Sequence, residues 1–188
     1  MVNYIVSGLE RSGTSMMMQI LYLGGMKVAF DTKRKPDEHN PKGYFELEGG
    51  KIISRLMRGD FPIEKYDGMV IKVTAYGIKY LPIGYRYKVI YMLRDLDEIM
   101  ASMSKMIGER LSEEDKKAFD KLNKYTLQLL EQRDDIEYIT VRYDMVIENP
   151  RSEIERVNDF LGGILNVDSA VRAVNPSLYR NRKKEVMK

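Results

Sequence analysis

The sequence contains no cysteine and only one histidine, His39, and these absences exclude several kinds of chemistry. Without cysteine the chain has no disulfide bonds, no thiolate metal ligands and no thiol nucleophile. A single histidine also excludes a zinc site built from several histidines. A function that depends on any of these groups is therefore ruled out.

Long hydrophobic runs are also missing. No segment approaches the roughly 18 consecutive apolar residues of a transmembrane helix. The first four residues lack both a basic region and a long apolar run, so we expect no signal peptide. The net charge of +3 is too small to indicate a nucleic-acid or membrane surface. The sequence thus predicts a cytoplasmic protein with no nucleic-acid or membrane partner.

The 188 residues, of which 44% are hydrophobic, are enough for one domain with a sizeable core, and we expect a single domain over 1–188. Apolar strand-like runs alternate with helical segments. Because the strands show no polar alternation, they predict a parallel sheet covered on both faces, a three-layer α/β sandwich. We expect strands at 2–6, 26–30, 69–73, 88–93 and 136–141, helices at 13–24, 46–58, 95–107, 112–133 and 150–161, and a loop at 31–45.

The loop Ser7–Ser15, with the sequence SGLERSGTS, carries the strongest functional signal. It joins the first expected strand to a helix, and backbone N–H groups at such a helix N-terminus bind anions. Gly8 and Gly13 have the spacing of a P-loop. Thr14, however, stands where a nucleotide triphosphatase has its lysine, and the basic residue is Arg11 inside the loop. The loop therefore indicates a phosphate-like ligand other than the terminal phosphates of ATP.

A second anion site is indicated by Arg94, at the end of the strand 88–93, and by Ser102, two turns into the next helix. An arginine and a hydroxyl at this spacing can converge on one phosphate. The alternative is that Arg94 pairs with a surface carboxylate and Ser102 is merely exposed. A ligand with anionic groups at two places would use both sites.

Taken together, these features resemble the sulfotransferases that use 3′-phosphoadenosine 5′-phosphosulfate (PAPS). Arg94 and Ser102 resemble the family's 3′-phosphate site. The run Arg11-Ser12-Gly13-Thr14-Ser15 resembles the loop with which the family binds the 5′-phosphosulfate. Three further stretches agree with the family: Asn40–Glu46, Val141–Met145, and Asn149-Pro150 followed by Asp159–Gly162.

The resemblance implies a P-loop-like sulfotransferase fold and transfer of a sulfuryl group from PAPS to a hydroxyl or amine of a small-molecule or glycan acceptor. By analogy with phosphoryl transfer, catalysis then consists mainly of positioning and charge stabilisation. No metal is required. The resemblance also assigns Lys72 to the sulfuryl group, with Arg11 beside it, Tyr143 to the adenine and Arg180, or Arg182, to the 3′-phosphate. Lys72 could instead be a surface lysine and the basic C-terminal residues a tail.

The sequence departs from the family at two places. Thr74 stands where cytosolic members carry a histidine base, so we expect Glu46, or alternatively His39, to take the acceptor's proton. Glu46 could equally cap the helix that follows it. Met16 occupies the place of the family's adenine-stacking tryptophan.

Three other functions remain open at this stage. A P-loop kinase of nucleotides or small molecules would share the strand–loop–helix but not Thr14. A family member that binds the nucleotide without catalysis would explain the missing histidine and tryptophan. A subunit whose acceptor site forms with a partner would explain the short chain. The sequence predicts neither the acceptor nor the oligomeric state.

Overall fold

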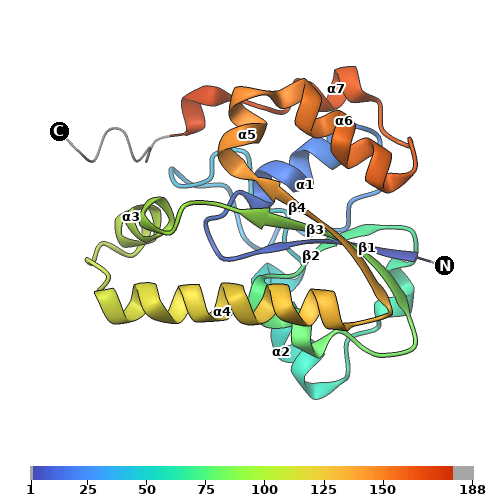
Figure 1. The fold of residues 1–188 in the computed structure, drawn as a ribbon, viewed down its shortest axis with the longest axis horizontal. Helices are drawn as coiled ribbons and strands as arrows, with labels where there is room; N and C mark the ends of the chain where they lie inside the picture. Colours follow the sequence, from blue (N-terminus) through green and yellow to red (C-terminus); the bar gives the residue numbers. More distant parts are fainter. Residues whose placement is uncertain (1, 180–188) are drawn as a thin grey trace.

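The computed structural model describes residues 2–179 and contains a parallel sheet of four strands in the order β2-β1-β3-β4. Helices cover both faces of this sheet (Figure 1). The predicted three-layer α/β architecture is therefore confirmed. The strands are β1 (Val2–Gly8), β2 (Val70–Lys72), β3 (Arg86–Leu93) and β4 (Ile136–Arg142).

The helices lie on the two faces of the sheet and beyond the carboxyl ends of its strands (Figure 1). On one face lie α1 (Thr14–Leu23), α5 (Tyr143–Glu148), α6 (Pro150–Leu161) and α7 (Val167–Val171). The other face is covered by α2 (Ile52–Arg58) and α4 (Glu113–Gln132), and α3 (Leu96–Ile107) follows the end of β3. Short 3-10 turns occupy Glu48–Gly50, Ile63–Tyr66, Ala75–Tyr80 and Pro176–Leu178.

Two of the expected elements differ. The segment 26–30 forms no strand; it contributes a single bridge between Val28 and Val70 at the sheet edge. The helix expected over 46–58 is interrupted, because Gly49 and Gly50 have φ angles of 63° and 89°, outside the helical region. A regular helix therefore begins only at Ile52.

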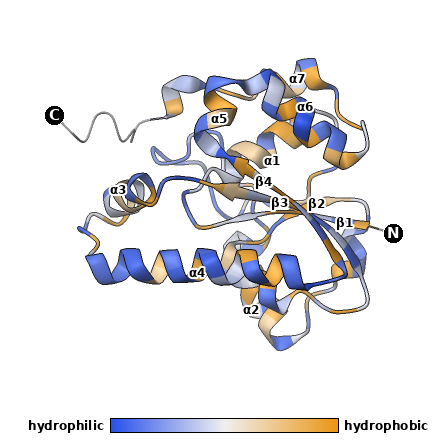
Figure 2. Ribbon diagram, viewed as in Figure 1, coloured by the Kyte–Doolittle hydropathy of each residue, from blue (hydrophilic) through white to orange (hydrophobic). Residues whose placement is uncertain are grey.

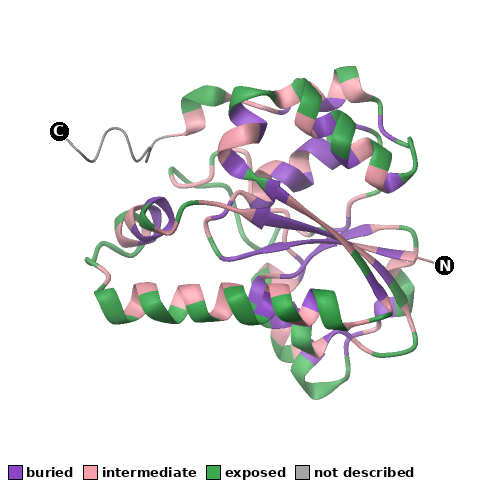
Figure 3. Cartoon of the chain, in the orientation of Figure 1, coloured by how far each residue is buried: buried purple, intermediate pink, exposed green. Residues whose placement is uncertain are grey.

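The sheet separates two apolar clusters; β1, β2 and β3 are mostly buried, whereas β4 is partly exposed (Figure 3). Alternate residues of β1 face opposite clusters, with Ile5 toward α2 and α4 and Val6 toward α1 and α6. The long helix α4 is hydrophilic over much of its surface (Figure 2), and its capping box at Ser112 and Asp115 fixes where it begins.

The strand order places the functional loop next to Arg94. From β1 the sheet continues to β2 on one side and to β3 on the other, and such a switch point opens a crevice beyond the carboxyl ends of the strands. In the register of the sheet, Gly8 of β1 is the partner of Met92 in β3. The residues that follow these two strands, which include Arg11 and Arg94, therefore emerge side by side.

Candidate functional site

A cleft at the carboxyl ends of β1, β2 and β3 gathers most of the predicted site residues. Its walls come from the loop after β1, the segment 31–46, the ends of β2 and β3, and α3. Arg180 and Arg182 lie outside the described residues. The predicted residues that line the cleft are Arg11, Gly13, Thr14, Ser15, His39, Glu46, Lys72, Arg94, Ser102 and Tyr143.

The N-terminus of α1 opens into this cleft without a side-chain cap. The first hydrogen bond of the helix runs from the N–H of Met17 to the C=O of Gly13, so earlier N–H groups have no acceptor within the helix. Gly13 has a φ of 101°, and a Cβ there would lie 2.4 Å from Cδ2 of Tyr143. Only glycine fits this position, and the resulting turn directs the N–H groups and the helix dipole toward an anion.

Arg11 joins the loop to two other walls of the cleft. Its Nε donates to Oγ of Ser102 at 3.0 Å and its Nη2 donates to the C=O of His39 at 3.1 Å. Its φ of 67° is unusual for a residue with a side chain and marks strained backbone. Burial lowers the pKa of Arg11, and the neighbouring Arg94 acts in the same direction. The two cations thus share one end of the cleft.

The side chain of Arg94 is 8% exposed and contacts the loop that follows β1. Its Nη1 donates to the C=O of Arg11 at 3.0 Å, and its Nε pairs with Oε2 of Glu98 at 3.0 Å. The guanidinium lies 4.5 Å from the ring centre of Tyr143 and 5.4 Å from that of Tyr179. The hydroxyl of Tyr179 donates to Oε1 of Glu98 at 2.7 Å. The carboxylate partner of Arg94 is therefore a buried residue of α3, not a surface one.

Lys72 ends β2 in the opposite wall, and only 6% of its surface is exposed. Its Nζ lies 3.0 Å from Oε1 of Glu46, donates to Oγ of Ser15 at 3.3 Å, and donates to the C=O of Tyr44. Burial lowers the pKa of Lys72, while the charge of Glu46 acts in the opposite direction. The surface-lysine alternative is thus excluded by the position of this side chain.

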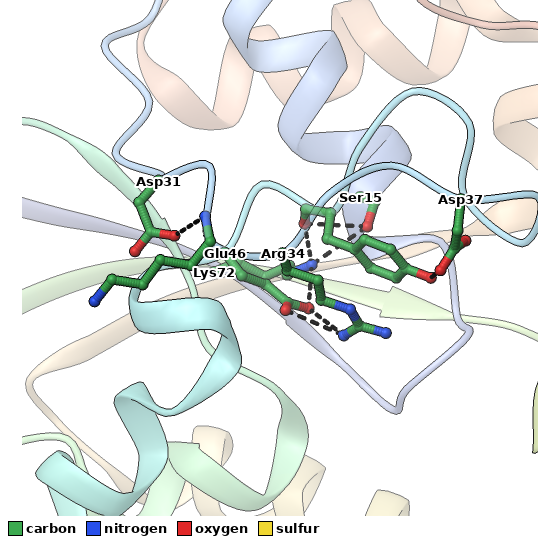
Figure 4. Close-up of polar contacts among 8 residues, drawn as sticks. Ser15, Asp31, Arg34, Asp37, Glu46 and Lys72 are labelled. Atoms are coloured by element: carbon green, nitrogen blue, oxygen red, sulfur yellow. Dashed lines mark hydrogen bonds and ion pairs between the residues drawn. The ribbon is translucent and has the colours of Figure 1, made fainter.

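Glu46 binds two cations at once. Besides its contact with Lys72, its carboxylate accepts hydrogen bonds from Nη1 of Arg34 at 3.1 and 3.3 Å (Figure 4). The carboxylate is therefore already paired with two cations before any acceptor binds. Glu46 does not cap a helix, since the 3-10 turn begins at Glu48 and α2 only at Ile52.

The segment 31–46 also carries site residues that the sequence analysis did not identify. Arg34 stacks over the ring of Tyr44, with its Cζ 3.5 Å from the ring centre. The hydroxyl of Tyr44 donates to both carboxylate oxygens of Asp37, at 2.7 and 2.9 Å, and lowers the pKa of Asp37 (Figure 4). Tyr44 stands in the Gly-Tyr-Phe-Glu run, which was the only sequence signal for this group.

Ser12 is the predicted residue that does not face the cleft. Its side chain is 1% exposed, and its N–H donates to the C=O of Leu9 at 3.2 Å. Its Oγ has no hydrogen-bond partner in the described part of the chain. A Cβ on Gly8 would lie 2.5 Å from this oxygen, so Ser12 packs beneath the loop.

The described residues contain neither a metal-binding cluster nor a membrane-spanning helix. Within residues 2–179, no three or more His, Cys, Asp or Glu side chains are grouped so that they could hold a metal ion. No helix in the same range has both the length and the apolar character needed to cross a membrane.

An uncapped helix N-terminus after a central strand, with cations around one cleft, is the arrangement with which α/β proteins of the P-loop type bind anionic ligands. The family described as "Sulfotransferase domain" matches residues 3–188 of this chain. Because the match spans nearly the whole sequence, the chain belongs to the sulfotransferase family. A comparison with curated proteins finds no significant match.

Three solved structures are similar to this chain, and one of them supports the fold. The sulfotransferase domain of the Synechococcus PCC 7002 olefin synthase is similar with a TM-score of 0.60 and 15% identity, over 100% of this chain and 83% of that one. A sulfotransferase domain of the curacin biosynthetic pathway gives 0.47, with 14% identity over 95% and 86%. Retinol dehydratase, solved with androsterone and inactive cofactor PAP, gives 0.45, with 15% identity over 95% and 64%. At 15% identity the likeness to the olefin synthase domain concerns the fold alone.

Proposed function

We propose that residues 1–188 form a single domain that transfers the sulfuryl group of PAPS to a hydroxyl or amine of a small-molecule or glycan acceptor. The observation that carries this proposal is the pairing of two groups of anion-binding donors in one cleft. One group surrounds the N-terminus of α1, and the other surrounds Arg94 and Ser102. PAPS has anionic groups on both sides of its nucleoside, whereas ATP needs only the first group.

The 5′ end of the nucleotide is assigned to the turn that begins α1. The N–H groups there, with the side chains of Thr14 and Ser15, offer donors to a phosphosulfate. When bound, PAPS supplies the sulfuryl group and leaves as adenosine 3′,5′-bisphosphate. Lys72 contacts Ser15 at the edge of this turn, so its ammonium can stabilise negative charge that develops beside the transferred group.

The 3′-phosphate is assigned to Ser102 and the two arginines beside it. Arg11 already donates to Ser102 at 3.0 Å, and Arg94 holds the carbonyl of Arg11. We therefore assign the guanidinium of Arg11 to the 3′-phosphate side as well as to the loop, while Arg94 contributes charge and rigidity. Tyr143, which lines the cleft against Gly13, is the proposed contact of the adenine.

Glu46 has two possible roles. Its contacts with Lys72 and Arg34 support a positioning role, because the carboxylate holds the buried ammonium in the wall of the cleft. Its role as the base that accepts the acceptor's proton stays a prediction, and so does the alternative assignment to His39. The variant Glu46→Gln separates these roles, since loss of a base changes the pH profile of turnover, whereas loss of positioning lowers turnover by a similar factor across the pH range.

A thermal-shift titration tests the proposed nucleotide. Adenosine 3′,5′-bisphosphate without Mg²⁺ should raise the melting temperature, because a ligand that binds only the folded state stabilises it. ATP with Mg²⁺ should have little effect. The reverse result would contradict the proposal and favour the kinase. Binding of the bisphosphate without any sulfated product, across a broad panel of acceptors, would instead indicate a member that binds the nucleotide but does not catalyse transfer.

A further inference from the structure

A buried carboxylate contacts Arg94 without lining the cleft. Glu98 lies in the first turn of α3, is 5% exposed, and accepts a hydrogen bond on Oε2 from Nε of Arg94 at 3.0 Å. Arg94 is among the residues that line the cleft, whereas Glu98 is not. A negative charge beside an arginine that binds phosphate opposes the binding of that phosphate. Glu98 therefore needs a compensating role.

The second oxygen of this carboxylate is held by Tyr179, near the C-terminus of the described chain. The phenol donates to Oε1 of Glu98 at 2.7 Å. Burial and the hydrogen bond to Glu98 both raise the pKa of Tyr179, so the phenol keeps its proton and remains a donor at neutral pH. The N–H of Tyr179 donates to the C=O of Pro176 at 3.1 Å, which fixes the backbone locally. Both oxygens of Glu98 are thus engaged, and its orientation is set.

The guanidinium of Arg94 is fixed by these contacts. Its Nε is held by Glu98, and its Nη1 donates to the C=O of Arg11 at 3.0 Å. The rings of Tyr143 and Tyr179 lie 4.5 and 5.4 Å from it and meet each other edge to face at 86°. Within residues 2–179, Nη2 of Arg94 makes no hydrogen bond. The N–H groups of Nη2 are therefore those left for a phosphate.

A fixed arginine binds an anion more tightly than a mobile one. Immobilising one long side chain on binding weakens affinity roughly two- to tenfold, and a guanidinium that is already held avoids this loss. Arg11 and Arg94 also repel each other at one end of the cleft. The charge of Glu98 offsets that repulsion while the cleft is empty. Glu98 thus keeps two neighbouring cations in place before the ligand arrives.

We propose that Glu98 is a positioning residue that, together with Tyr179, fixes the guanidinium of Arg94 for the 3′-phosphate of the nucleotide. This inference rests on the proposed function, because it needs a phosphate at Arg94. It is carried by a buried carboxylate outside the cleft that pairs on one oxygen with Arg94 and on the other with a phenol 81 residues later in the chain. The affinity of the 3′-phosphate site then depends on the segment that ends at Tyr179.

Titration calorimetry with two nucleotides tests the role of Glu98. Adenosine 5′-phosphate lacks the 3′-phosphate that adenosine 3′,5′-bisphosphate carries. Glu98→Ala should weaken the bisphosphate about tenfold or more and leave the 5′-phosphate within about twofold. Glu98→Gln keeps an acceptor for Arg94 and should restore the bisphosphate to within about threefold of wild type. The matched control is Asp97→Ala, in the same turn of α3 but paired with Lys116, which should leave both affinities within about twofold.

The contribution of Tyr179 is tested by removing its hydroxyl and keeping its ring. Tyr179→Phe should weaken the bisphosphate about three- to fivefold in the wild-type background and have no further effect in Glu98→Ala. Tyr125→Phe, at an exposed tyrosine of α4, is the control and should leave the affinity within about twofold. If Glu98→Ala does not fold, the ratio of bisphosphate to 5′-phosphate affinity in Tyr179→Phe carries the test.

The outcomes separate positioning from its alternatives. Equal losses of both nucleotides in Glu98→Ala would show a purely structural role and overturn the proposal. Tighter bisphosphate binding in both Glu98→Ala and Glu98→Gln would also overturn it, because the carboxylate would then compete with the phosphate. Additive losses in the double variant would remove Tyr179 from the network. If wild-type protein does not bind the bisphosphate, the proposed function itself fails.

Discussion

Replacing Glu46 with glutamine should destabilise the protein because it leaves the ammonium of Lys72 buried without its carboxylate partner. The two side chains are 3.0 Å apart, with 4% of the Lys72 and 13% of the Glu46 side chain exposed. Breaking a buried ion pair by removing one partner costs about 3–5 kcal/mol. Lys72 keeps its contacts with Ser15 and the Tyr44 carbonyl, so we expect about 2–3 kcal/mol. For a chain of this length that corresponds to a melting temperature lower by about 4–12 °C.

The loss should depend on pH. Burial lowers the pKa of Lys72 below its ordinary value of 10.5, so between the folded and unfolded pKa values the unfolded state binds more protons. The stability contributed by Lys72 therefore rises with pH through this window and levels off above about 10.5. Glu46→Gln removes a charge that raises this pKa, which extends the window to lower pH. The difference between variant and wild type should thus shrink as the pH rises from 7 to 10.

A double-mutant cycle provides the assay. Urea unfolding followed by circular dichroism gives the free energy of unfolding for Glu46→Gln, Lys72→Met and the double variant. We expect the double variant to be more stable than the sum of the single losses predicts by about 1–2 kcal/mol, since it removes both charges. Glu131→Gln, an exposed position on α4, is the matched control and should change stability by less than about 0.5 kcal/mol. Additive single losses, or no pH dependence, would refute this account of the pair.

Three further predictions concern the anion sites. Arg94→Ala should weaken binding of adenosine 3′,5′-bisphosphate at least tenfold more than that of adenosine 5′-phosphate; equal losses in calorimetry would remove Arg94 from the 3′-phosphate site. Gly13→Ala should cost about 3 kcal/mol or more of stability in urea unfolding, because its Cβ meets Tyr143, whereas Gly25→Ala, with a similar φ of 97° but open space, should cost about 1 kcal/mol. If the two glycine variants lose the same amount, strain alone explains Gly13. Lys72→Met should lower turnover about 100-fold or more with little change in bisphosphate affinity, and unchanged turnover would argue against a role at the sulfuryl group.

The fold and the family were predictable from local signals. Strands without polar alternation and a loop with the SGLERSGTS pattern require only short stretches of sequence, and both predictions are confirmed. Two differences were not predicted. The helix expected over 46–58 is interrupted because Gly49 and Gly50 adopt positive φ angles. The segment 26–30 lies at the sheet edge and forms only one bridge, despite its apolar sequence. The roles of individual site residues stay predictions.

The partners of the buried charges could not be read from the sequence. Glu98 pairs with Arg94, four residues earlier in the sequence. Its other partner, Tyr179, is 81 residues later in the sequence. Glu46 appeared as a candidate base and emerged as the partner of Lys72 and Arg34. Such pairs depend on how the helices and strands pack together, and the hydrophobic periodicity of the sequence does not indicate them.

By itself the sequence determined that a glycine-bearing loop follows the first strand, that Arg11 replaces the usual lysine, and that the chain is a sulfotransferase of α/β type. These properties follow from residue type and short-range spacing, which act on the backbone locally. Tertiary structure alone decided that Arg11 lies against Ser102, that Lys72 is buried beside Glu46, and that the hydroxyl of Tyr179 reaches Glu98. Each of these depends on the sheet, whose parallel register brings distant strand ends to one edge before any side chain can meet its partner.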